Sequence, residues 1–394
     1  MKRCNDAAQQ SISVRTVRAA LPTHALACTI VAEKQGADAR VTAESDHIVA
    51  DTAARIFADL ADPQTVNRAQ DKAWSDRLWA ALTEAGLPLA WVPEACGGSG
   101  ASLAEGFEVL GAAGRFALSA PLAETMLAGW LLARANMTCP GDIMTLAPCR
   151  PQDNIRLASD GKSSGEALVP FAGDSHHIAV LAESASGPQI ALVATSACRM
   201  AEARHLAGEP SRVVDFAGVT PLAVAPAPKG FSAGDLMLMG AAARSVQTAG
   251  ALQAVLTMSV AYANERVAFE RPIGKFQAVQ QNLARLAGEV AAALAAAGSA
   301  ADTLAEGKVD DEAVFLEVAS AKVRCAEAAA EGAAIAHQVF GAIGFTQEHV
   351  LHRFTLRMLA WRDDFGSEGW WAAELGRRVA QSGADAFWPL VASR

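Results

Sequence analysis

The sequence predicts an α+β protein that is mostly helical, with an N-terminal helical domain, a central β-sandwich or barrel, and a C-terminal four-helix bundle. Alanine and leucine, which favour helices, are abundant, whereas aromatic residues make up only 6% of the chain. Apolar residues recur at helical spacing in the first and last parts of the chain, and short strand-like runs occupy the middle. With 394 residues and 52% apolar side chains, the chain can bury a substantial core.

Residues 1–43 precede the first helical pattern. They contain Lys2, Arg3, Arg15 and Arg18 among serine and threonine. Such a segment can be a disordered leader, the product of an upstream start-codon assignment, or an organelle-targeting presequence. We expect a disordered leader.

Residues 44–139 form the predicted N-terminal helical domain. Apolar side chains recur at helical spacing, as at Val49, Ala53 and Ile56. The segment 92–100 interrupts this pattern with one proline and three glycines, and therefore predicts a turn. The turn has two readings, a plain connection between helices or a glycine-rich loop that holds a phosphate.

Residues 140–230 form the predicted β-domain. Short apolar runs bounded by glycine and proline are typical of strands, and their spacing favours antiparallel pairing. The runs that share this character are Ala167–Phe171, His177–Ala182, Gln189–Val193 and Arg212–Phe216.

Residues 231–394 form the predicted C-terminal helical bundle. Asp310 and Asp311 favour the start of one helix, where carboxylates interact with the helix dipole, and Gly341 favours its end. The helical segments expected here are Leu236–Phe269, Phe276–Glu306, Asp311–Phe340, Gln347–Trp361 and Trp370–Gln381.

The charge balance and the cysteine pattern exclude several functional classes. A net charge of −9 and the lack of a basic run argue against a nucleic-acid or anionic-membrane partner. No run reaches the roughly 18 uninterrupted apolar residues that a membrane span needs. The seven cysteines are scattered and form no CxxC pair, so we expect a reduced, cytoplasmic location. We expect no metal site, and find no GxSxG, P-loop or GxGxxG motif after a strand.

The segment 262–280 combines charges with a sharp turn. It predicts the end of one helix, a tight turn at Pro272–Gly274, and a new helix near Phe276. Arg266 and Arg271 would then lie close to the amide-rich start of the second helix, which favours a diphosphate. The alternative is an amphipathic turn with solvated charges.

This segment resembles the acyl-CoA dehydrogenase pattern R-x-x-F-G-x-x-I-x-x-x-Q. The resemblance implies that Arg266 grips the diphosphate of FAD, that Phe269 packs beside the adenine, and that Gln277 contacts the cofactor, usually across a subunit interface. The sequence departs from the pattern at Glu270, where the family has glycine, and this carboxylate adds negative charge near the diphosphate.

Two further segments resemble the same family. Residues 92–100 are similar to its V-P-E-x-x-G-G-x-G turn. Residues 338–345 are similar to its Q-x-x-G-G-x-G-F turn, which implies that Gln338 and Gly341 approach the cofactor of a neighbouring subunit, although Ala342 replaces one glycine. The order of helices, strands and helices also matches the family's plan, so the resemblance covers roughly residues 45–394.

The resemblance implies α,β-dehydrogenation of an acyl-CoA thioester, with electrons passed to an electron-transfer flavoprotein. A carboxylate base is needed because the α-proton is only weakly acidic. The two family positions for that base fall on Gly366 and near Gly240, neither of which can accept a proton. Asp363, Asp364 and Glu368 lie within a turn of the vacant position at Gly366, and Asp364 is the candidate catalytic residue. The alternative is that Arg362, Asp363 and Asp364 form surface ion pairs.

The β-domain lacks a clear T-E-P-x-x-G-S-D motif, the family's usual flavin and substrate loop, and residues 145–153 match it poorly. Three hypotheses follow: an FAD-containing acyl-CoA dehydrogenase, a noncatalytic subunit completing the flavin site of a Glu-bearing paralogue, or a flavin enzyme of the same fold with another substrate. A site shared between subunits predicts a dimer or tetramer.

Overall fold

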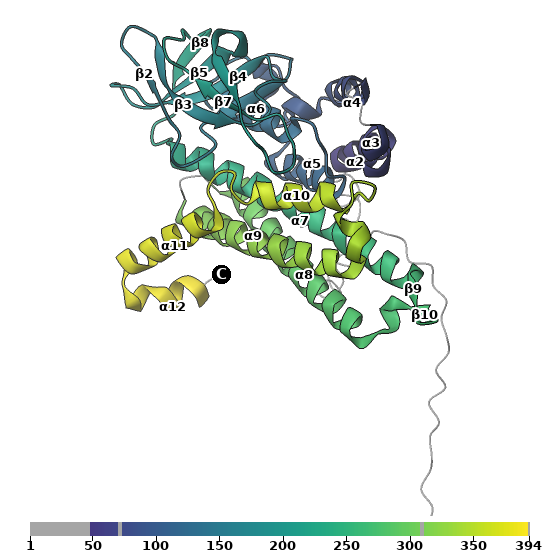
Figure 1. The fold of residues 1–394 in the computed structure, drawn as a ribbon. Coiled ribbons are helices and arrows are strands. Elements are labelled where there is room, and N and C mark those ends of the chain that lie inside the picture. Colours follow the sequence, from purple (N-terminus) through teal and green to yellow (C-terminus); the bar gives the residue numbers. More distant parts are fainter. Residues whose placement is uncertain (1–47, 70–72, 308–310, 393–394) are drawn as a thin grey trace, which may run out of the picture. The chain divides into compact units, whose positions relative to one another are not determined.

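The structure, a computed structural model, describes residues 48–69, 73–307 and 311–392 (Figure 1). The predicted leader over 1–43 lies outside the described residues. The chain order is helices, strands and helices, as the sequence predicts.

Helices make up the first part of the described chain. α5 starts with a capping box, in which the Ser102 hydroxyl accepts from the Glu105 amide while the Glu105 carboxylate accepts from the Ser102 amide. α6 is buried along most of its length because it lies against the sheet that contains β1, β4 and β5. The helices and single turns are α2 (Ile48–Leu60), α3 (Pro63–Ala69), α4 (Ala73–Glu84), η1 (Leu87–Leu89), η2 (Glu94–Cys96), α5 (Leu103–Arg115) and α6 (Leu122–Arg134).

The central part contains two four-stranded sheets, ordered β1-β4-β5-β8 and β2-β3-β7-β6. The prediction of antiparallel pairing is wrong for one pair, because β1 runs parallel to β4, with Met144 opposite His177. A parallel pair needs a crossover, and here the chain passes through the second sheet between the two strands. The strands are β1 (Met144–Ala147), β2 (Asn154–Leu157), β3 (Ser163–Val169), β4 (His177–Ala182), β5 (Gln189–Ala194), β6 (Arg199–Glu202), β7 (Arg212–Asp215) and β8 (Ala223–Pro226).

Long helices return after the sheets. The first ends at Glu265 rather than at the predicted Phe269, because the chain turns into a two-residue hairpin of β9 (Val267–Ala268) and β10 (Arg271–Pro272). The hairpin lies at the far end of the bundle from the sheets (Figure 1). The remaining elements are α7 (Ala233–Glu265), η4 (Ile273–Lys275), α8 (Gln277–Glu306), α9 (Glu312–Phe340), η5 (Gly341–Phe345), α10 (Leu351–Trp361), α11 (Glu368–Ser382) and α12 (Ala384–Ala392).

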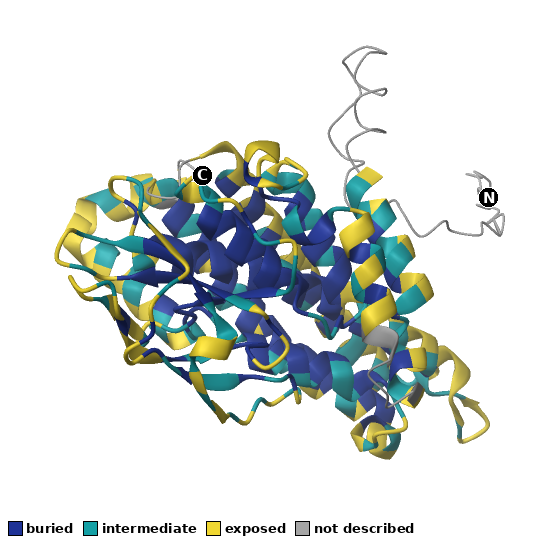
Figure 2. Cartoon of the chain, turned by 90° about the horizontal axis from the view of Figure 1, so that it is seen from above, coloured by how far each residue is buried: buried dark blue, intermediate teal, exposed yellow. Residues whose placement is uncertain are grey.

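The core runs continuously from the N-terminal helices into the bundle. Buried side chains of α5, α6, α7 and α9 belong to one apolar cluster, and a second cluster lies between α7, α8, α9 and α10 (Figure 2). By length and mean hydropathy, α8 is the one described helix that could cross a membrane, although it carries Arg285 and Glu289 and packs against α9. The fold thus places the 266–277 segment at an exposed end of a well-packed bundle.

Candidate functional site

The β9–β10 hairpin presents the residues predicted to contact the cofactor. Its two central residues, Phe269 and Glu270, have φ of 52° and 66°, a left-handed conformation that suits glycine better than a residue with a Cβ. The Ile273 amide donates to the Arg266 carbonyl at 2.8 Å and closes the hairpin. Because the turn is tight, the Phe269 side chain projects outward and is 89% exposed.

Positive charge gathers around this hairpin. Within the described part of the chain, the side chains of Arg266, Arg271 and Lys275 make no ion pair, although the Arg271 guanidinium lies 4.2 Å from the centre of the Phe276 ring. Phe276 supplies no side-chain cap to α8, so the first amides of that helix, beginning at Gln277, stay open. Unpaired cations next to an uncapped helix start fit the diphosphate of a dinucleotide.

A second predicted segment, the turn that follows α9, lines a pocket of about 590 Å³. Gln338 and Gly341 both line it, together with His337 and Phe345, and alanines of α9 form its floor. The His337 ring stacks on the Phe345 ring at 4.5 Å, and Phe345 is itself 74% exposed. An apolar slot with one amide side chain fits an aromatic base.

The two segments lie at the same end of the bundle. Tyr262, one turn before Arg266, stacks on Phe340 at 4.4 Å, and its hydroxyl donates to the Phe340 carbonyl. Gly341 follows Phe340 directly. The packing therefore brings together two stretches that are far apart in the sequence, while leaving Arg266, Phe269, Gln277 and Gln338 exposed. Exposed ligands of this kind fit a cofactor that is shared with another chain.

The two expected positions of the base also meet in space. The Phe365 ring is fully buried and packs on Gly240 so closely that a Cβ on Gly240 would lie 2.2 Å from it. Gly366 has φ of 95°, and a Cβ there would come within 2.8 Å of both Trp370 and Trp371. Phe365 thus fills the region between the positions where a carboxylate was sought.

Both backbone polar groups of Phe365 form hydrogen bonds. Its amide donates to the Cys149 carbonyl at 2.8 Å, and its carbonyl accepts from Trp371 Nε1 at 2.9 Å. Cys149 belongs to the loop 145–153, which stands where the family's flavin and substrate motif was expected. Because Cys149 is buried, the pKa of its thiol is raised well above the ordinary value, and the thiol stays protonated.

Asp364, the candidate base, is held in a buried ionic network. Its Oδ2 accepts from Arg244 Nε at 2.9 Å, and Arg244 also donates to Glu124 Oε1 at 2.5 Å and to Gln247 Oε1 at 2.7 Å. Arg244 and Glu124 are each 2% exposed. The reading of Asp364 as part of a surface ion pair is therefore wrong, because its partner lies in the core. Arg362 instead pairs with Glu368 at 2.7 Å.

The electrostatics of this network are set by burial. Burial raises the pKa of Glu124, although Arg244 opposes that shift. Burial opposes the charge of Arg244, but the surrounding carboxylates hold its pKa above the ordinary value. Nearby, burial lowers the pKa of Lys322 to about 8, and its Nζ donates to the Trp361 carbonyl. Asp364 therefore lies beside several buried charged groups.

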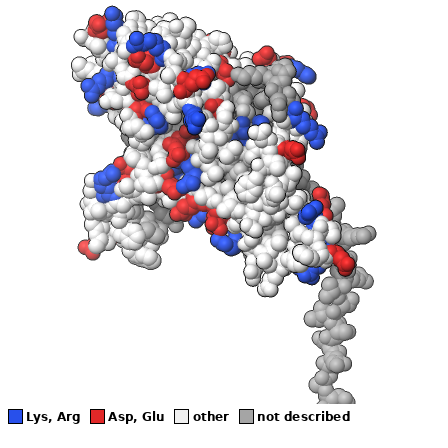
Figure 3. Space-filling model, viewed as in Figure 1, with Lys and Arg blue, Asp and Glu red and all other residues white. Residues whose placement is uncertain are grey.

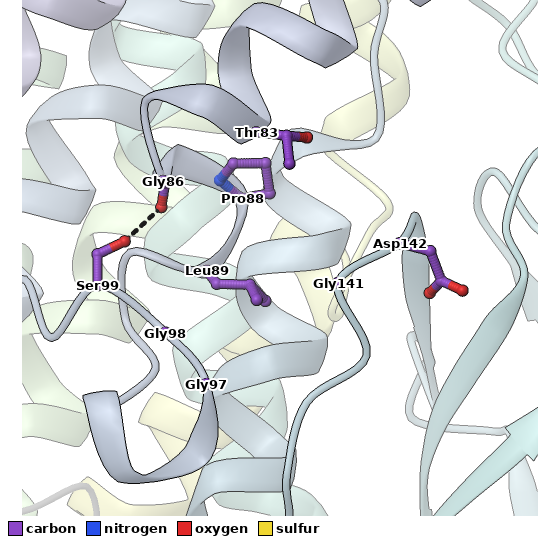
Figure 4. A pocket seen from close by; sticks show the side chains of 9 residues that line it. All are labelled: Thr83, Gly86, Pro88, Leu89, Gly97, Gly98, Ser99, Gly141 and Asp142. Carbon is purple, nitrogen blue, oxygen red and sulfur yellow. Dashed lines mark hydrogen bonds between the residues drawn. The ribbon is translucent and has the colours of Figure 1, made fainter.

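The amides of the three glycines in the turn at 92–100 are not open to a phosphate. Backbone carbonyls accept from the amides of residues 97 to 100, at 2.9 to 3.2 Å. The turn borders a surface pocket of about 330 Å³ between Leu89 and Asp142 (Figure 4). The internal hydrogen bonds favour the reading of a plain connection between helices.

No cluster of three or more histidine, cysteine or acidic side chains that could bind a metal occurs among the described residues. Both signs of charge are interspersed on the face shown in Figure 3. Sequence reasoning missed His337, Phe365, Arg244 and Glu124, because no local motif marks these residues.

Comparisons with known proteins bear on the fold and the family resemblance. Residues 232–379 match the family model described as acyl-CoA dehydrogenase, C-terminal domain. The chain is 28% identical over 323 residues to acyl-CoA dehydrogenase IpdE2 of Mycobacterium tuberculosis, covering 80% of this chain and 91% of the relative. It is 29% identical over 355 residues to acyl-CoA dehydrogenase FadE27 of the same organism, covering 78% and 89%.

Solved structures share the fold. The ChsE4–ChsE5 complex of Mycobacterium tuberculosis superposes with a TM-score of 0.78 at 24% identity, covering 86% of this chain and 98% of that chain. The FAD complex of PigA superposes with a TM-score of 0.72 at 18% identity, covering 89% and 100%. The fold is thus of the acyl-CoA dehydrogenase type. Residues 232–379 match the C-terminal domain of the acyl-CoA dehydrogenase family, and the chain is similar to an acyl-CoA dehydrogenase over 80% of its length.

Proposed function

We propose that this chain is a subunit of an FAD-dependent acyl-CoA dehydrogenase that carries out α,β-dehydrogenation of an acyl-CoA thioester and passes electrons to an electron-transfer flavoprotein. One observation carries the proposal: the Arg266 hairpin and the Gln338 turn lie at one end of the bundle with their side chains exposed. Such residues can hold the dinucleotide part of a flavin only where another chain covers it. We therefore propose a dimer or tetramer in the cytoplasm.

In this arrangement, Arg266 and the start of α8 hold the diphosphate, and Gln338 with Gly341 contacts the adenine end. When bound, FAD supplies the hydride acceptor of the reaction. Glu270 opposes the diphosphate electrostatically, while Arg271 and Lys275 oppose Glu270. The net charge of these residues is positive, so the hairpin fits the cofactor.

A second candidate function is a noncatalytic subunit whose partner, a Glu-bearing paralogue, supplies the base. The packing of Phe365 on Gly240 favours this candidate, because it fills the region that a base and a thioester would share. Asp364 is the base proposed if the chain acts alone; one of its oxygens, Oδ2, accepts a hydrogen bond from Arg244.

Native mass spectrometry tests both candidates by counting chains and flavins, for the chain alone and for the chain co-expressed with its genomic neighbours. Arg266→Gln should lower FAD affinity roughly tenfold or more, because a hydrogen bond to a charged group contributes about 1.5–3 kcal/mol. Arg285→Gln is the matched control, since this exposed arginine on α8 pairs with Glu331. Absence of bound FAD in every combination contradicts the proposal.

Dye reduction with acyl-CoA separates the two candidates. Turnover by the purified chain alone assigns the chemistry to this chain, and its loss in Asp364→Asn would then identify the base. Turnover only after mixing with a Glu-bearing partner supports the noncatalytic role. Failure to retain the chain on immobilised acyl-CoA, despite bound FAD, favours a flavin enzyme that acts on another substrate.

A further inference from the structure

Three histidines converge on the turn that lines the 590 Å³ pocket. His337 lies in the last turn of α9, His349 precedes α10, and His352 lies in the first turn of α10. None of them belongs to a motif that the family resemblance identified. One of them makes a contact that requires an unprotonated ring nitrogen, and another has a buried ring nitrogen without a hydrogen-bond partner.

His337 is held in its neutral form. Its Nε2 lies 3.1 Å from Thr355 Oγ1, and the Thr355 hydroxyl donates to the Leu351 carbonyl, so Nε2 donates to Thr355. Its Nδ1 is buried beneath Gly344 without a hydrogen-bond partner. A proton on Nδ1 would therefore create a buried charge with no acceptor, which costs far more than an unpaired lone pair.

His349 is held neutral by a different contact. Its Nδ1 accepts from the Leu351 amide at 3.1 Å, so the ring caps the first amide of α10. A protonated Nδ1 cannot accept this bond. The ring also packs on Phe340 at 4.5 Å, and Phe340 stacks on Tyr262 beside the hairpin. Protonation of His349 would thus loosen the start of α10 and the turn before it.

The groups that face these rings strengthen the effect. His352 Nδ1 donates to the His349 carbonyl at 2.7 Å, and the charge of His352 disfavours protonation of both other rings. Arg353 and Arg357, the arginines of α10, interact with Glu209 instead. Tyr262, which stacks on Phe340, bonds the Phe340 carbonyl, and Glu348 directly precedes His349 in the chain. Among the described residues, no carboxylate is paired with His337 or His349.

We propose that His337 and His349, in their neutral forms, are positioning residues that hold the Gly341–Phe345 turn in the shape that lines the pocket, and that their protonation releases this turn. The consequence for flavin binding rests on the proposed function. The behaviour of the turn itself does not, and it can be measured without flavin.

The direction of the pH effect follows from the contacts. Burial lowers the pKa of His337 and of His349, with the charges of neighbouring histidines adding to the shift. A group whose pKa is lower in the folded protein stabilises it fully above the unfolded pKa of about 6.5, and that stabilisation is lost as the pH falls through the folded pKa. The turn should hold at neutral pH and open under mild acid.

Hydrogen exchange of the full chain, at about pH 7.5 and about pH 5.5 with times scaled for the intrinsic rate, tests this. Amides of residues 343–353, which include Leu351 and Thr346, should lose protection roughly tenfold at the lower pH. Amides of α7 should not change. Equal protection of residues 343–353 at both pH values would overturn the proposal.

A double variant separates protonation from general acid destabilisation. Asparagine and glutamine keep the acceptor of His349 and the donor of His337 but do not titrate, so His337→Gln with His349→Asn should stay protected at both pH values. His176→Gln, at an exposed histidine in the strand region, is the matched control and should open as the wild type does. If the double variant opens in acid like the wild type, the proposal is wrong. Loss of protection in α7 at neutral pH would show that the double variant is destabilised as a whole. The proposal is then tested by the hydrogen exchange of the wild type at the two pH values.

Discussion

At the scale of single residues, Gly240 and Phe365 depend on one another. The Phe365 ring can reach its buried position only because residue 240 has no side chain, since a Cβ there would lie 2.2 Å from the ring. Phe365 itself has a φ of 54°, which is unfavourable for a residue with a Cβ, and hydrogen bonds on both of its backbone groups maintain it. A carboxylate side chain at residue 240 would therefore clash with the Phe365 ring in this packing.

Gly240→Ala should lower the free energy of unfolding by about 1–3 kcal/mol, because an extra methyl group in a filled core displaces its neighbours. Chemical denaturation measures the change. Gly376→Ala is the matched control, since a Cβ at this position of α11 meets nothing within 4 Å. That variant should gain about 0.5–1 kcal/mol, because alanine suits a helix better than glycine. Unchanged stability of Gly240→Ala would mean that Phe365 moves aside easily.

At the scale of secondary structure, the β9–β10 hairpin is strained. Both of its central residues adopt left-handed φ values, and neither is glycine or asparagine. The family pattern has glycine at the second of them. The hairpin keeps its shape through the hydrogen bond from Ile273 to Arg266 and through the ring contact of Phe269 with Phe276 at 6.2 Å.

Glu270→Gly should therefore stabilise the hairpin, because a left-handed residue with a Cβ costs about 1–2 kcal/mol. The Ile273 amide, which closes the hairpin, should exchange its hydrogen roughly tenfold more slowly. Glu270→Gln retains the strain and removes only the charge, so exchange in this variant should match the wild type. A similar slowing in both variants would show that charge, and not backbone conformation, limits the hairpin.

At the scale of the whole molecule, buried ion pairs connect elements from all parts of the fold. Arg244 on α7 joins Glu124 on α6 to Asp364 after α10, and Arg357 on α10 bonds Glu209 from the strand region at 3.0 Å. Each pair is largely shielded from water. Such pairs contribute little net stability over apolar packing, but loss of one partner leaves a buried charge unpaired.

Arg244→Met should lower the free energy of unfolding by about 3–5 kcal/mol, because Glu124 and Asp364 lose their partner. Thermal denaturation measures the loss, and Glu124→Gln with Asp364→Asn should recover part of it. Burial already raises the pKa of Glu124, so its protonation favours the folded state as the pH falls. The loss should thus be smaller near about pH 5 than near about pH 8. An equal loss of stability at both pH values would show that protonation of Glu124 does not reduce it.

Local features of this protein follow from the sequence. The strand His177–Ala182 has the predicted bounds, and α9 begins after Asp311, whose side chain accepts from the Ala313 amide, because apolar runs and caps act over a few residues. The Arg266–Gln277 segment is equally local, so its resemblance identified the family. The left-handed hairpin inside this segment was not predicted, since Glu270 gives no turn signal.

Contacts between distant segments came only from the tertiary structure. Parallel pairing of β1 with β4 depends on a crossover that short apolar runs do not encode. Asp364 lies two residues before Gly366 in the chain, which suggested a base, yet the folded chain pairs it with the buried Arg244. The partner of Gly240 is Phe365, and only packing across the bundle brings them together. A motif indicates what its own segment can bind. Contacts with residues of other elements determine whether that segment can take part in catalysis.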